Sequence, residues 1–528
     1  MRTYIQKHIQ NKKVKKKLKG LTKIVFSRTA IIVLLMLVQI ALIIIAFDWM
    51  KAKSVYFYGF FLVLTVLTVV AIINERSNPM IKLSWIVPVL VLPVFGVLFY
   101  LFIQMQLGTK MIAYRLNKLT EQTKPYLQQD EDTLIELRRE NQQIANLAYY
   151  MSGKGGYPIY KNSEVTYFPI GEKKFAALTE ELRKAKHFIF MEYFIVEEGY
   201  MWNTIRDILI EKVSKGVEVR FMYDGMCSVT MLPYNYPKTL QRFGIKSKMF
   251  APIRPVLSSS QNNRDHRKIV VIDGEVAFTG GVNLADEYIN RKVRFGHWKD
   301  SAVMVRGEAV RAFLMMFLQM WNITEKNTEN YEQYLRYVQT APRCREDGFV
   351  MAYGDSPFDQ ENAGEEVYMS MIHRAKHYVH IMTPYLILDH EMLRALQFSA
   401  KSGVEVCIIM PHIPDKWYAF VLAKTYYEEL IDAGVQIYEY TPGFIHAKSF
   451  VVDGEEAVVG TINLDFRSLY LHFEDAVYMY QNSEINKIEE DYQTTLLKCQ
   501  RVTKEDCKNI SFVDKVAGRV LRLFAPLM

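Results

Sequence analysis

Hydrophobic positions follow two different patterns along the chain, and the change comes near residue 150. The N-terminal part contains long uncharged apolar runs, at residues 29–47, 55–73 and 83–103. About 20 apolar residues suffice to cross a bilayer, so each run predicts a membrane-spanning helix. After residue 150, short β-branched runs alternate with helix-like stretches, as in an α/β fold with a largely buried sheet. We therefore expect a membrane region followed by an α/β body.

The third apolar run differs from the other two because it contains Pro88, Pro93 and Gly96. Proline frees backbone groups of a helix, and in lipid these groups must find other partners. The number of spans decides where the body lies, since the positive-inside rule places the Lys-rich residues 1–28 in the cytoplasm. Two spans would return the body to the cytoplasm and three would place it outside. The sequence leaves both topologies open.

The basic N-terminal arm also bears on the partner of the protein. Residues 1–28 hold ten Lys or Arg and no Asp or Glu; because the whole chain has a net charge of +8, the other 500 residues sum to −2. A basic arm before apolar spans favours an anionic membrane surface, and a nearly neutral body does not favour nucleic acid. A cleaved signal peptide is the alternative for the first run, but the arm is long, the run is full length and a second span follows.

Two stretches of the body carry the same residues at the same spacing. Each contains a His, a Lys two residues later and an Asp five residues after that, followed by a Gly and an Asn. The first copy comprises His266, Lys268, Asp273, Gly280 and Asn283, and the second comprises His446, Lys448, Asp453, Gly460 and Asn463. A lone His-x-Lys pair in a strand is usually a surface feature, but two copies with matched Gly and Asn indicate a duplicated chemical unit.

These residue types suit chemistry on a phosphodiester. On a strand, a His and a Lys two residues apart leave the same face. An imidazole can attack or transfer a proton near neutral pH, and a Lys ammonium can hold phosphate oxygens. The Gly allows the backbone to approach a ligand and the Asn adds donors, whereas the Asp is expected to fix the strand-to-turn geometry rather than touch substrate. No zinc-type Cys/His spacing and no GK[ST] phosphate loop occurs, so we expect neither a metal nor a nucleotide cofactor.

The duplication extends over the whole α/β body. Lys186–Phe194 is similar to Lys376–Leu386, Gly216–Val219 to Gly403–Val406, and Phe243–Ile245 to Ala433–Val435. We therefore expect two halves, residues 151–335 and 336–528, with the active site in the cleft between them. The helix-prone residues 104–150 are expected to form a linker or a lid against the membrane.

Near the C-terminus, apolar residues recur at helical spacing with basic residues between them. The apolar set is Phe512, Val513, Val516, Val520, Leu523 and Phe524, and the basic set is Lys515, Arg519 and Arg522. Such an amphipathic helix can lie in the lipid interface or pack onto the protein itself, and the sequence favours neither.

The paired motifs, with their Gly and Asn, resemble those of the phospholipase D superfamily, and together with the apolar N-terminus they look most like the bacterial cardiolipin synthases. The resemblance implies two duplicated phospholipase D-type α/β/α halves behind N-terminal transmembrane helices, in a multi-pass protein of a bacterial cell membrane. That family usually shows two spans, so the third apolar run and the long basic arm are departures from it.

The resemblance also implies which acids orient the motif histidines. An imidazole that attacks or carries a proton needs its other nitrogen held, usually by a carboxylate. Asp300 and Glu474 resemble the orienting acids of the family. Simple register pairs Asp475 with Asp300 instead, and solvated surface acids are the remaining alternative.

The implied reaction joins two molecules of phosphatidylglycerol into cardiolipin and releases glycerol. One histidine, provisionally His266, would attack phosphorus to give a phosphohistidine, and His446 would protonate the departing glycerol and then activate the second lipid. The pseudo-symmetric motifs do not say which histidine has which role. The side chains expected to hold the phosphoryl oxygens are Lys268, Lys448, Asn283 and Asn463.

Three other functions can be weighed against this one. A membrane-bound phospholipase D that passes the intermediate to water would share the first step and yield phosphatidic acid. A nuclease is disfavoured because the body is not basic and follows membrane spans. A non-enzymatic scaffold with relict motifs would show erosion of one motif, and both are complete.

Overall fold

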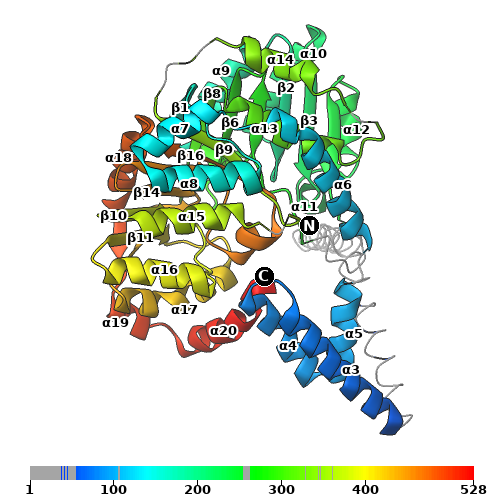
Figure 1. The fold of residues 1–528 in the computed structure, drawn as a ribbon, viewed down its shortest axis with the longest axis vertical. Coiled ribbons are helices and arrows are strands. Elements are labelled where there is room, and N and C mark those ends of the chain that lie inside the picture. Colours follow the sequence, from blue (N-terminus) through cyan, green and yellow to red (C-terminus); the bar gives the residue numbers. More distant parts are fainter. Residues whose placement is uncertain are drawn as a thin grey trace, which may run out of the picture.

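The computed structural model describes residues 55–104, 107–253, 262–327 and 329–527, apart from 343, 345, 346 and 360, together with Leu37, Ala41 and Ile45. The basic arm and the first predicted span, residues 29–47, therefore lie outside the described residues except for those three. Within the described part, apolar helices form one end of the molecule and an α/β body forms the rest (Figure 1).

The first half of the body is built on a seven-stranded sheet. Its strands are β1 (Ser163–Phe168), β2 (Phe188–Tyr193), β3 (Glu218–Asp224), β4 (Lys246–Phe250), β5 (Ile269–Ile272), β6 (Val276–Gly280) and β8 (Ala302–Gly307), in the order β1-β8-β6-β5-β2-β3-β4. β2, β3 and β4 are parallel and the other pairs are antiparallel. Every residue of β2 is buried, as expected for a near-continuous apolar strand covered on both faces. The main helices are α9 (Gly171–Lys184), α10 (Tyr200–Ser214), α12 (Tyr236–Gln241), α13 (Val310–Asn322) and α14 (Glu332–Thr340).

The second half repeats this sheet strand for strand. Its strands are β9 (Phe349–Asp355), β10 (Tyr378–Met382), β11 (Glu405–Pro411), β12 (Gln436–Tyr440), β14 (Ser449–Val452), β15 (Glu456–Gly460), β16 (Glu474–Tyr480) and β17 (Cys499–Arg501), in the order β17-β12-β11-β10-β14-β15-β16-β9. Apart from β17, which extends one edge, each strand has its counterpart in the first half. The main helices are α15 (Ala363–Arg374), α16 (His390–Lys401), α17 (Trp417–Asp432) and α18 (Glu484–Leu496). The prediction of a duplicated α/β body is confirmed.

Short backbone ladders join the two halves beside the motifs. β7 (His297–Lys299) of the first half pairs in parallel with β13 (Gly443–Ile445) of the second half. The amide of His446 then donates to the carbonyl oxygen of Lys299 at 2.6 Å, and the amide of His266 donates to that of Phe473 at 2.9 Å. Each motif histidine is thus tied to the chain of the opposite half.

The segment between the N-terminal apolar helices and the body is folded onto the body. Residues 104–150 contain α6 (Leu107–Thr123), α7 (Glu131–Glu140) and α8 (Gln142–Tyr150). Leu116 and Leu119 are buried in a core shared with α13, and Leu134 and Leu137 are buried in the core of the second half. The boundary expected at residues 335–336 falls inside α14, where Tyr337 stacks on His187 of the first half. The structure therefore divides the halves after α14.

The third apolar run is not one continuous helix. α4 (Pro79–Val91) and α5 (Pro93–Gln104) fold back on each other at Leu92, so that the rings of Trp85 and Tyr100 lie 5.6 Å apart. Pro93 cannot donate an amide hydrogen bond to the preceding turn, and Gly96 permits the close approach, because a Cβ there would lie 2.5 Å from the carbonyl oxygen of Pro88. The expectation of a single span over 83–103 is therefore wrong, since Pro93 and Gly96 favour a hairpin at Leu92.

The apolar helices pack together at one end of the molecule. α3 (Val55–Asn74) covers the second predicted span and packs against α4 and α5, with Ile72, Val89 and Val97 buried between them. In the described part of the chain, one helix, Pro93–Tyr126, is long and apolar enough to cross a membrane. The apolar segments Gly59–Asn74 and Pro79–Val91 are shorter.

Candidate active site

The motif residues sit at the start of equivalent strands, β5 and β14, where each chain enters its sheet. His266, Lys268, His446 and Lys448 are all buried. In both copies the Lys ammonium donates a hydrogen bond to the carbonyl oxygen of the motif His two residues earlier. The two copies therefore have the same local conformation, which the shared spacing predicts.

Each motif histidine is held by a carboxylate from the other half. Nδ1 of His266 lies 2.8 and 2.9 Å from the carboxylate oxygens of Glu474, and Nδ1 of His446 lies 2.7 Å from Oδ2 of Asp300. Neither acid is a solvated surface group, because both are fully buried. Among the described residues, neither Nε2 atom has a protein hydrogen-bond partner. A carboxylate at Nδ1 leaves Nε2 free to attack or to exchange a proton.

Neighbouring groups fix the two acids in turn. Thr461 Oγ1 donates to Oε2 of Glu474 at 2.5 Å, and the Ser301 amide donates to Oδ1 of Asp300 at 2.8 Å. Gly281 lies directly under Asp300, since a Cβ there would be 2.0 Å from Oδ1. A larger residue at position 281 would displace the acid from His446.

Asp475, the competitor of Glu474, does not contact a motif imidazole. Its Oδ1 lies 3.4 Å from the amide nitrogen of Lys268, and burial raises its pKa to about 6. Glu474 and Asp475 are neighbours on β16 and point to opposite faces of the strand, so only one of them can reach His266.

The motif aspartates hold the backbone rather than the reaction centre. The carboxylate of Asp273 accepts hydrogen bonds from three consecutive amides, residues 186–188, and that of Asp453 accepts three from residues 376–378, at 2.6 to 2.8 Å. Both aspartates also adopt positive φ values, 53° and 54°. They tie the turn after one strand to the start of the neighbouring strand, in agreement with the geometric role expected for them. The two aspartates therefore support the motif structurally and do not contact the motif histidines.

The predicted ligand-binding glycines have a packing role in the structure. A Cβ on Gly280 would lie 2.4 Å from Cα of Ala302, and one on Gly460 would lie 2.4 Å from Cβ of Ala476. Each glycine therefore lets two neighbouring strands approach, β6 with β8 and β15 with β16. The close approach of the strands is enough to explain a glycine at both positions, without a ligand.

The motif asparagines are buried but differ in their partners. Asn283 accepts a hydrogen bond from the amide of Ile195 and donates one to Tyr288, so both ends of its amide are used. Asn463 donates to Ser468, and its Oδ1 is buried without a hydrogen-bond partner. A buried amide oxygen of this kind is costly unless a ligand or water satisfies it. Asn463 is therefore the better placed of the two to contact a substrate.

Burial and like charges lower the pKa values of the site. Desolvation lowers the pKa of Lys448 to about 7 and that of Lys268 to about 8, and it lowers the pKa of His446 to about 4. The charge of Lys268 contributes to the shifts of both Lys448 and His446, which shows that the two motifs share one electrostatic site. For His266, burial lowers the pKa well below its usual value, against the opposing charge of Glu474. Both imidazoles are thus neutral in the free site, and an anionic ligand would favour their protonation.

His472 lies in the site but was not predicted as one of its residues. Its ring lies 5.6 Å from that of His266, it is buried, and both of its nitrogens lack a hydrogen-bond partner among the described residues. The register Gly280–Ala302 and Gly460–Ala476 makes Trp298 its counterpart in the first half. Comparing the two halves in this register does not reveal His472, because its counterpart is not a histidine.

His266, His472 and Glu474 are also close enough to share a metal ion, with ligand atoms within 4.8 Å, so the expected absence of a metal stays a prediction.

Comparison with known proteins agrees with these motifs. The family model "Cardiolipin synthase, PLD-like domain" matches residues 178–321 and 368–496, one segment for each half, and the model "Phospholipase_D-nuclease N-terminal" matches residues 63–104. The chain belongs to the cardiolipin synthase family. A cardiolipin synthase of Alkalihalophilus pseudofirmus is 35% identical over 87% of this chain and 91% of its own length. An uncharacterized protein of Streptococcus mutans is 49% identical over 87% of this chain and 99% of its own length.

A solved structure supports the fold of this cardiolipin synthase family member independently. The phosphatidylserine synthase of Haemophilus influenzae superposes with a TM-score of 0.53, at 12% identity, over 72% of this chain and 98% of that protein. At this identity the likeness concerns the fold alone.

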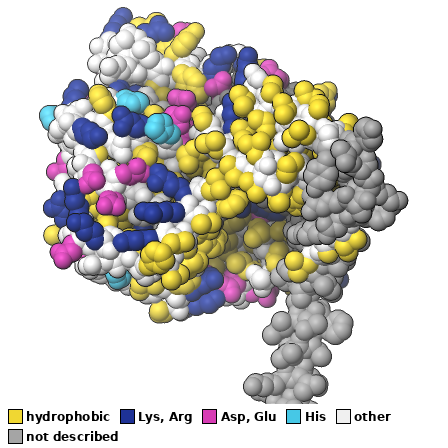
Figure 2. Space-filling model, turned by 90° about the horizontal axis from the view of Figure 1, so that it is seen from below, with side chains coloured by type: hydrophobic (Ala, Val, Ile, Leu, Met, Phe, Trp, Pro, Cys, Tyr) yellow, Lys and Arg dark blue, Asp and Glu magenta, His cyan; other side chains and the backbone are white. Residues whose placement is uncertain are grey.

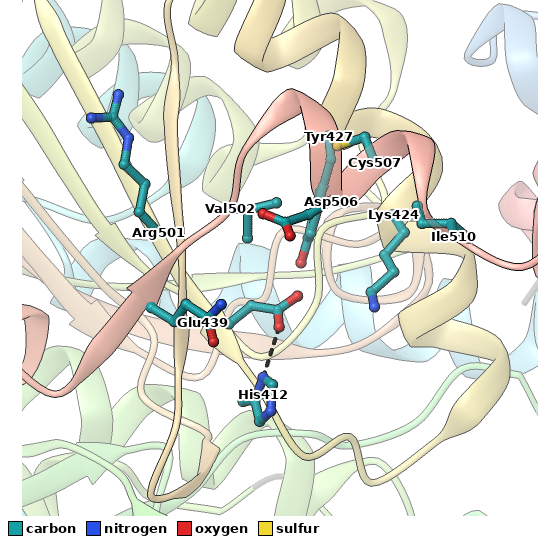
Figure 3. A pocket seen from close by; sticks show the side chains of 10 residues that line it. His412, Lys424, Tyr427, Glu439, Arg501, Val502, Asp506, Cys507 and Ile510 are labelled. Carbon is teal, nitrogen blue, oxygen red and sulfur yellow. Dashed lines mark hydrogen bonds and ion pairs between the residues drawn. The ribbon is translucent and has the colours of Figure 1, made fainter.

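A separate pocket lies on the second half at β12 and β17, and two strands, β11 and β10, separate β12 from β14. It has a volume of about 200 Å³ and is lined by α17, β12, β17 and the short helix α19 (Lys504–Lys508). His412 and Glu439 form a hydrogen-bonded pair in it, with 2.9 Å between Nδ1 and Oε2, and Lys424 and Asp506 also line it (Figure 3). The pocket contains no motif residue. Its His–carboxylate pair is therefore a useful control for the pairs of the active site.

Proposed function

We propose that the protein transfers a phosphatidyl group from one phosphatidylglycerol to another, which gives cardiolipin and glycerol. The observation that carries the proposal is a pair of crossed contacts, in which the histidine of each half is held by the acid of the other half: His266 by Glu474 and His446 by Asp300. Two lysines whose charges act on one site lie beside them. Two imidazoles with free Nε2 atoms can divide the work of nucleophile and general acid–base. Family membership supports a phospholipid as the substrate. The N-terminal apolar helices would hold the enzyme in the cell membrane, in a multi-pass arrangement.

The proposed reaction has two displacements at phosphorus. Nε2 of His266 attacks the first phosphatidylglycerol, the bond from phosphorus to the glycerol oxygen breaks, and protonated His446 gives its proton to that oxygen. Neutral His446 then takes the proton of a terminal hydroxyl on the second phosphatidylglycerol. The resulting oxygen attacks phosphorus, and the bond between phosphorus and His266 breaks. Lys268 and Lys448 would stabilise the oxygens of each transition state. The free Oδ1 of Asn463 would accept a hydrogen bond from a hydroxyl of the glycerol headgroup.

A product assay tests the proposal directly. Purified full-length protein is incubated in mixed micelles of phosphatidylglycerol, and cardiolipin, glycerol and phosphatidic acid are quantified. We expect cardiolipin and free glycerol in equal amounts, because each transfer releases one glycerol. Phosphatidic acid as the main product would instead identify a hydrolase, in which water accepts the phosphatidyl group. Micelles of phosphatidylcholine alone, which supply no glycerol headgroup, serve as the control.

The low pKa values of the two lysines predict an alkaline loss of activity. As pH rises through 7 to 8, Lys448 and then Lys268 lose their charges in the free enzyme. If both charges are required, kcat/KM should fall by up to about 10-fold per pH unit between pH 7 and 8 and by up to about 100-fold per pH unit above pH 8. The anionic phosphodiester stabilises both ammonium groups in the complex, so the corresponding fall in kcat should occur at higher pH. Both profiles are measured from pH 6 to 10 in phosphatidylglycerol micelles.

Two lysine variants make this pH test specific. The guanidinium of Lys448→Arg stays protonated, so the alkaline fall of kcat/KM should move upward in whatever activity remains. Lys248→Arg changes a partly buried lysine outside the site, whose pKa is also lowered by burial, and should leave the profile unchanged. A kcat/KM that stays constant to pH 10 in the parent protein would contradict the role given to the two ammonium groups.

A further inference from the structure

The C-terminal helix α20 (Phe512–Phe524) has its apolar side turned away from the protein. Phe512 is 80% exposed, Val513 71% and Val520 55%, and Val516, Leu523 and Phe524 are exposed to at least 37%. At 100° per residue these six positions fall within one arc of about 120°. A surface helix of a globular protein normally turns such a stripe toward the core.

The opposite side of α20 is fixed against α17. Gly518 is the buried residue of the helix, and a Cβ there would lie 2.6 Å from Thr425 and 3.1 Å from the carbonyl oxygen of Val421. Arg522 pairs with Glu429 at 2.7 Å and lies over the ring of Tyr426. These contacts set the rotation of the helix about its axis. Within the described part of the chain the apolar stripe does not pack onto the protein, which was one of the two alternatives from the sequence.

The exposed stripe continues the apolar surface of the N-terminal helices. Ser84 of α4 donates a hydrogen bond to the carbonyl oxygen of Leu523 at 2.8 Å, which joins the end of α20 to α4. Beyond this joint the exposed apolar side chains of α3 and α4 include Phe60, Leu62, Val63, Val66, Leu67, Val70, Leu83, Leu90 and Val91. Seen from this end of the molecule, hydrophobic side chains gather over a large part of the face (Figure 2).

We propose that α20 lies in the membrane interface, parallel to the bilayer plane, with its apolar stripe among the acyl chains and α17 behind it. The continuity with α3 and α4 selects a bilayer as the occupant of the stripe. Charges do not decide the contact, because the groove of about 380 Å³ between α17 and α20 carries equal numbers of bases and acids: Lys424, Lys515, Arg519 and Arg522 with Glu428, Glu429, Asp432 and Asp514. Apolar insertion therefore dominates the contact, which does not depend on the reaction proposed above.

Depth measurement in vesicles tests this placement. Single cysteines at Val513, Val516 and Val520 are labelled with an environment-sensitive fluorophore. They are placed in full-length protein whose native cysteines are replaced, Cys344 and Cys499 by serine and the buried Cys227, Cys407 and Cys507 by alanine. The protein is reconstituted in vesicles of phosphatidylglycerol and phosphatidylcholine, some with spin-labelled acyl chains. We expect blue-shifted emission and quenching that corresponds to about 5–10 Å below the headgroups. The label at Glu505, an exposed site on α19, is the control and should show neither effect.

Two results would overturn the proposal. Labels on the stripe that emit as in water, like the control, would show that α20 stands clear of the bilayer. A blue shift without quenching by the spin-labelled lipids would show that protein covers the stripe, and a dependence on protein density would identify a second copy of the chain. Retained lipid product formation by each labelled variant shows that the fold is intact. Addition of 0.5 M salt should leave the quenching at Val516 nearly unchanged, because the groove is electrically balanced.

Discussion

Replacement of either motif histidine by alanine is expected to remove phosphatidyl transfer. His266→Ala loses the proposed nucleophile and His446→Ala loses the proton carrier, so each should lower kcat by at least about 10⁴-fold. The double variant should be no worse than about the slower single variant, because the two residues act in one sequence of steps. Cardiolipin formation from phosphatidylglycerol measures all three. The matched control is His412→Ala, which removes a histidine with its own carboxylate partner, Glu439, from the pocket outside the site.

A trapping experiment assigns the two roles. A phosphatidyl ester with an aryl leaving group needs little protonation, so His446→Ala should still form the covalent adduct, whereas His266→Ala should not. Radiolabel retained on protein after a rapid quench at alkaline pH, where phosphohistidine survives, measures the adduct. Adduct in His266→Ala and none in His446→Ala would exchange the roles. Full turnover in both variants would remove the motifs from the reaction altogether.

Neutralising the two acids that hold the motif histidines should lower kcat nearly as much as removing the histidines. Glu474→Gln and Asp300→Asn keep the size of the side chain but no longer hold the Nδ1 proton or stabilise an imidazolium, so kcat should fall by about 10² to 10⁴-fold with little change in KM. Both acids are fully buried, and each variant removes a buried charge. The thermal midpoint should therefore fall little, and a large fall in kcat at a nearly constant midpoint would show positioning rather than a general structural role.

Asp475→Asn is the matched control for Glu474→Gln. It neutralises the adjacent buried acid, which contacts the amide of Lys268 but no motif imidazole, and should lower kcat by less than about 10-fold. Nitrogen NMR of labelled histidines reports the tautomer of His266, which should change in Glu474→Gln and not in Asp475→Asn. If Asp475→Asn proved the more harmful of the two, the orienting role of Glu474 would be wrong.

The repeated motif was sufficient to predict the duplicated halves, because a fixed spacing of His, Lys, Asp, Gly and Asn reports one local structure twice. The side chains of His446 and Asp300 could not be paired in the same way. They are 146 residues apart in the sequence, and the strand pair β7–β13 brings them together. The simple sequence register pairs Asp300 with Asp475, whereas the strand register makes Glu474 the counterpart of Asp300. This shift of one residue is the reason that the sequence left Asp475 as an alternative to Glu474.

The third apolar run and the motif glycines show the same limit of the sequence. Apolar content alone predicted one span over residues 83–103, whereas Pro93 and Gly96 fold the chain back on itself at Leu92. Similarly, Gly280 was expected to admit a ligand; the structure shows that it admits a neighbouring strand, and its approach to a ligand stays a prediction. In each case the residue type indicated a close approach, and the sequence could not say what approaches.

The crossing of the two histidine–acid pairs has a consequence for how such a molecule could arise. A single half carries an imidazole and a carboxylate that cannot meet each other, so the smallest working unit is a pair of halves. Two identical subunits could supply that pair, but both copies of the histidine and of the acid would then have the same surroundings, because the two sequences are the same. Once both halves belong to one polypeptide, the two copies can change independently. In this chain the position of Asp300 in the first half corresponds to Glu474 in the second half, and the position of Trp298 corresponds to His472. That inequality suits a mechanism in which one histidine attacks and the other carries a proton.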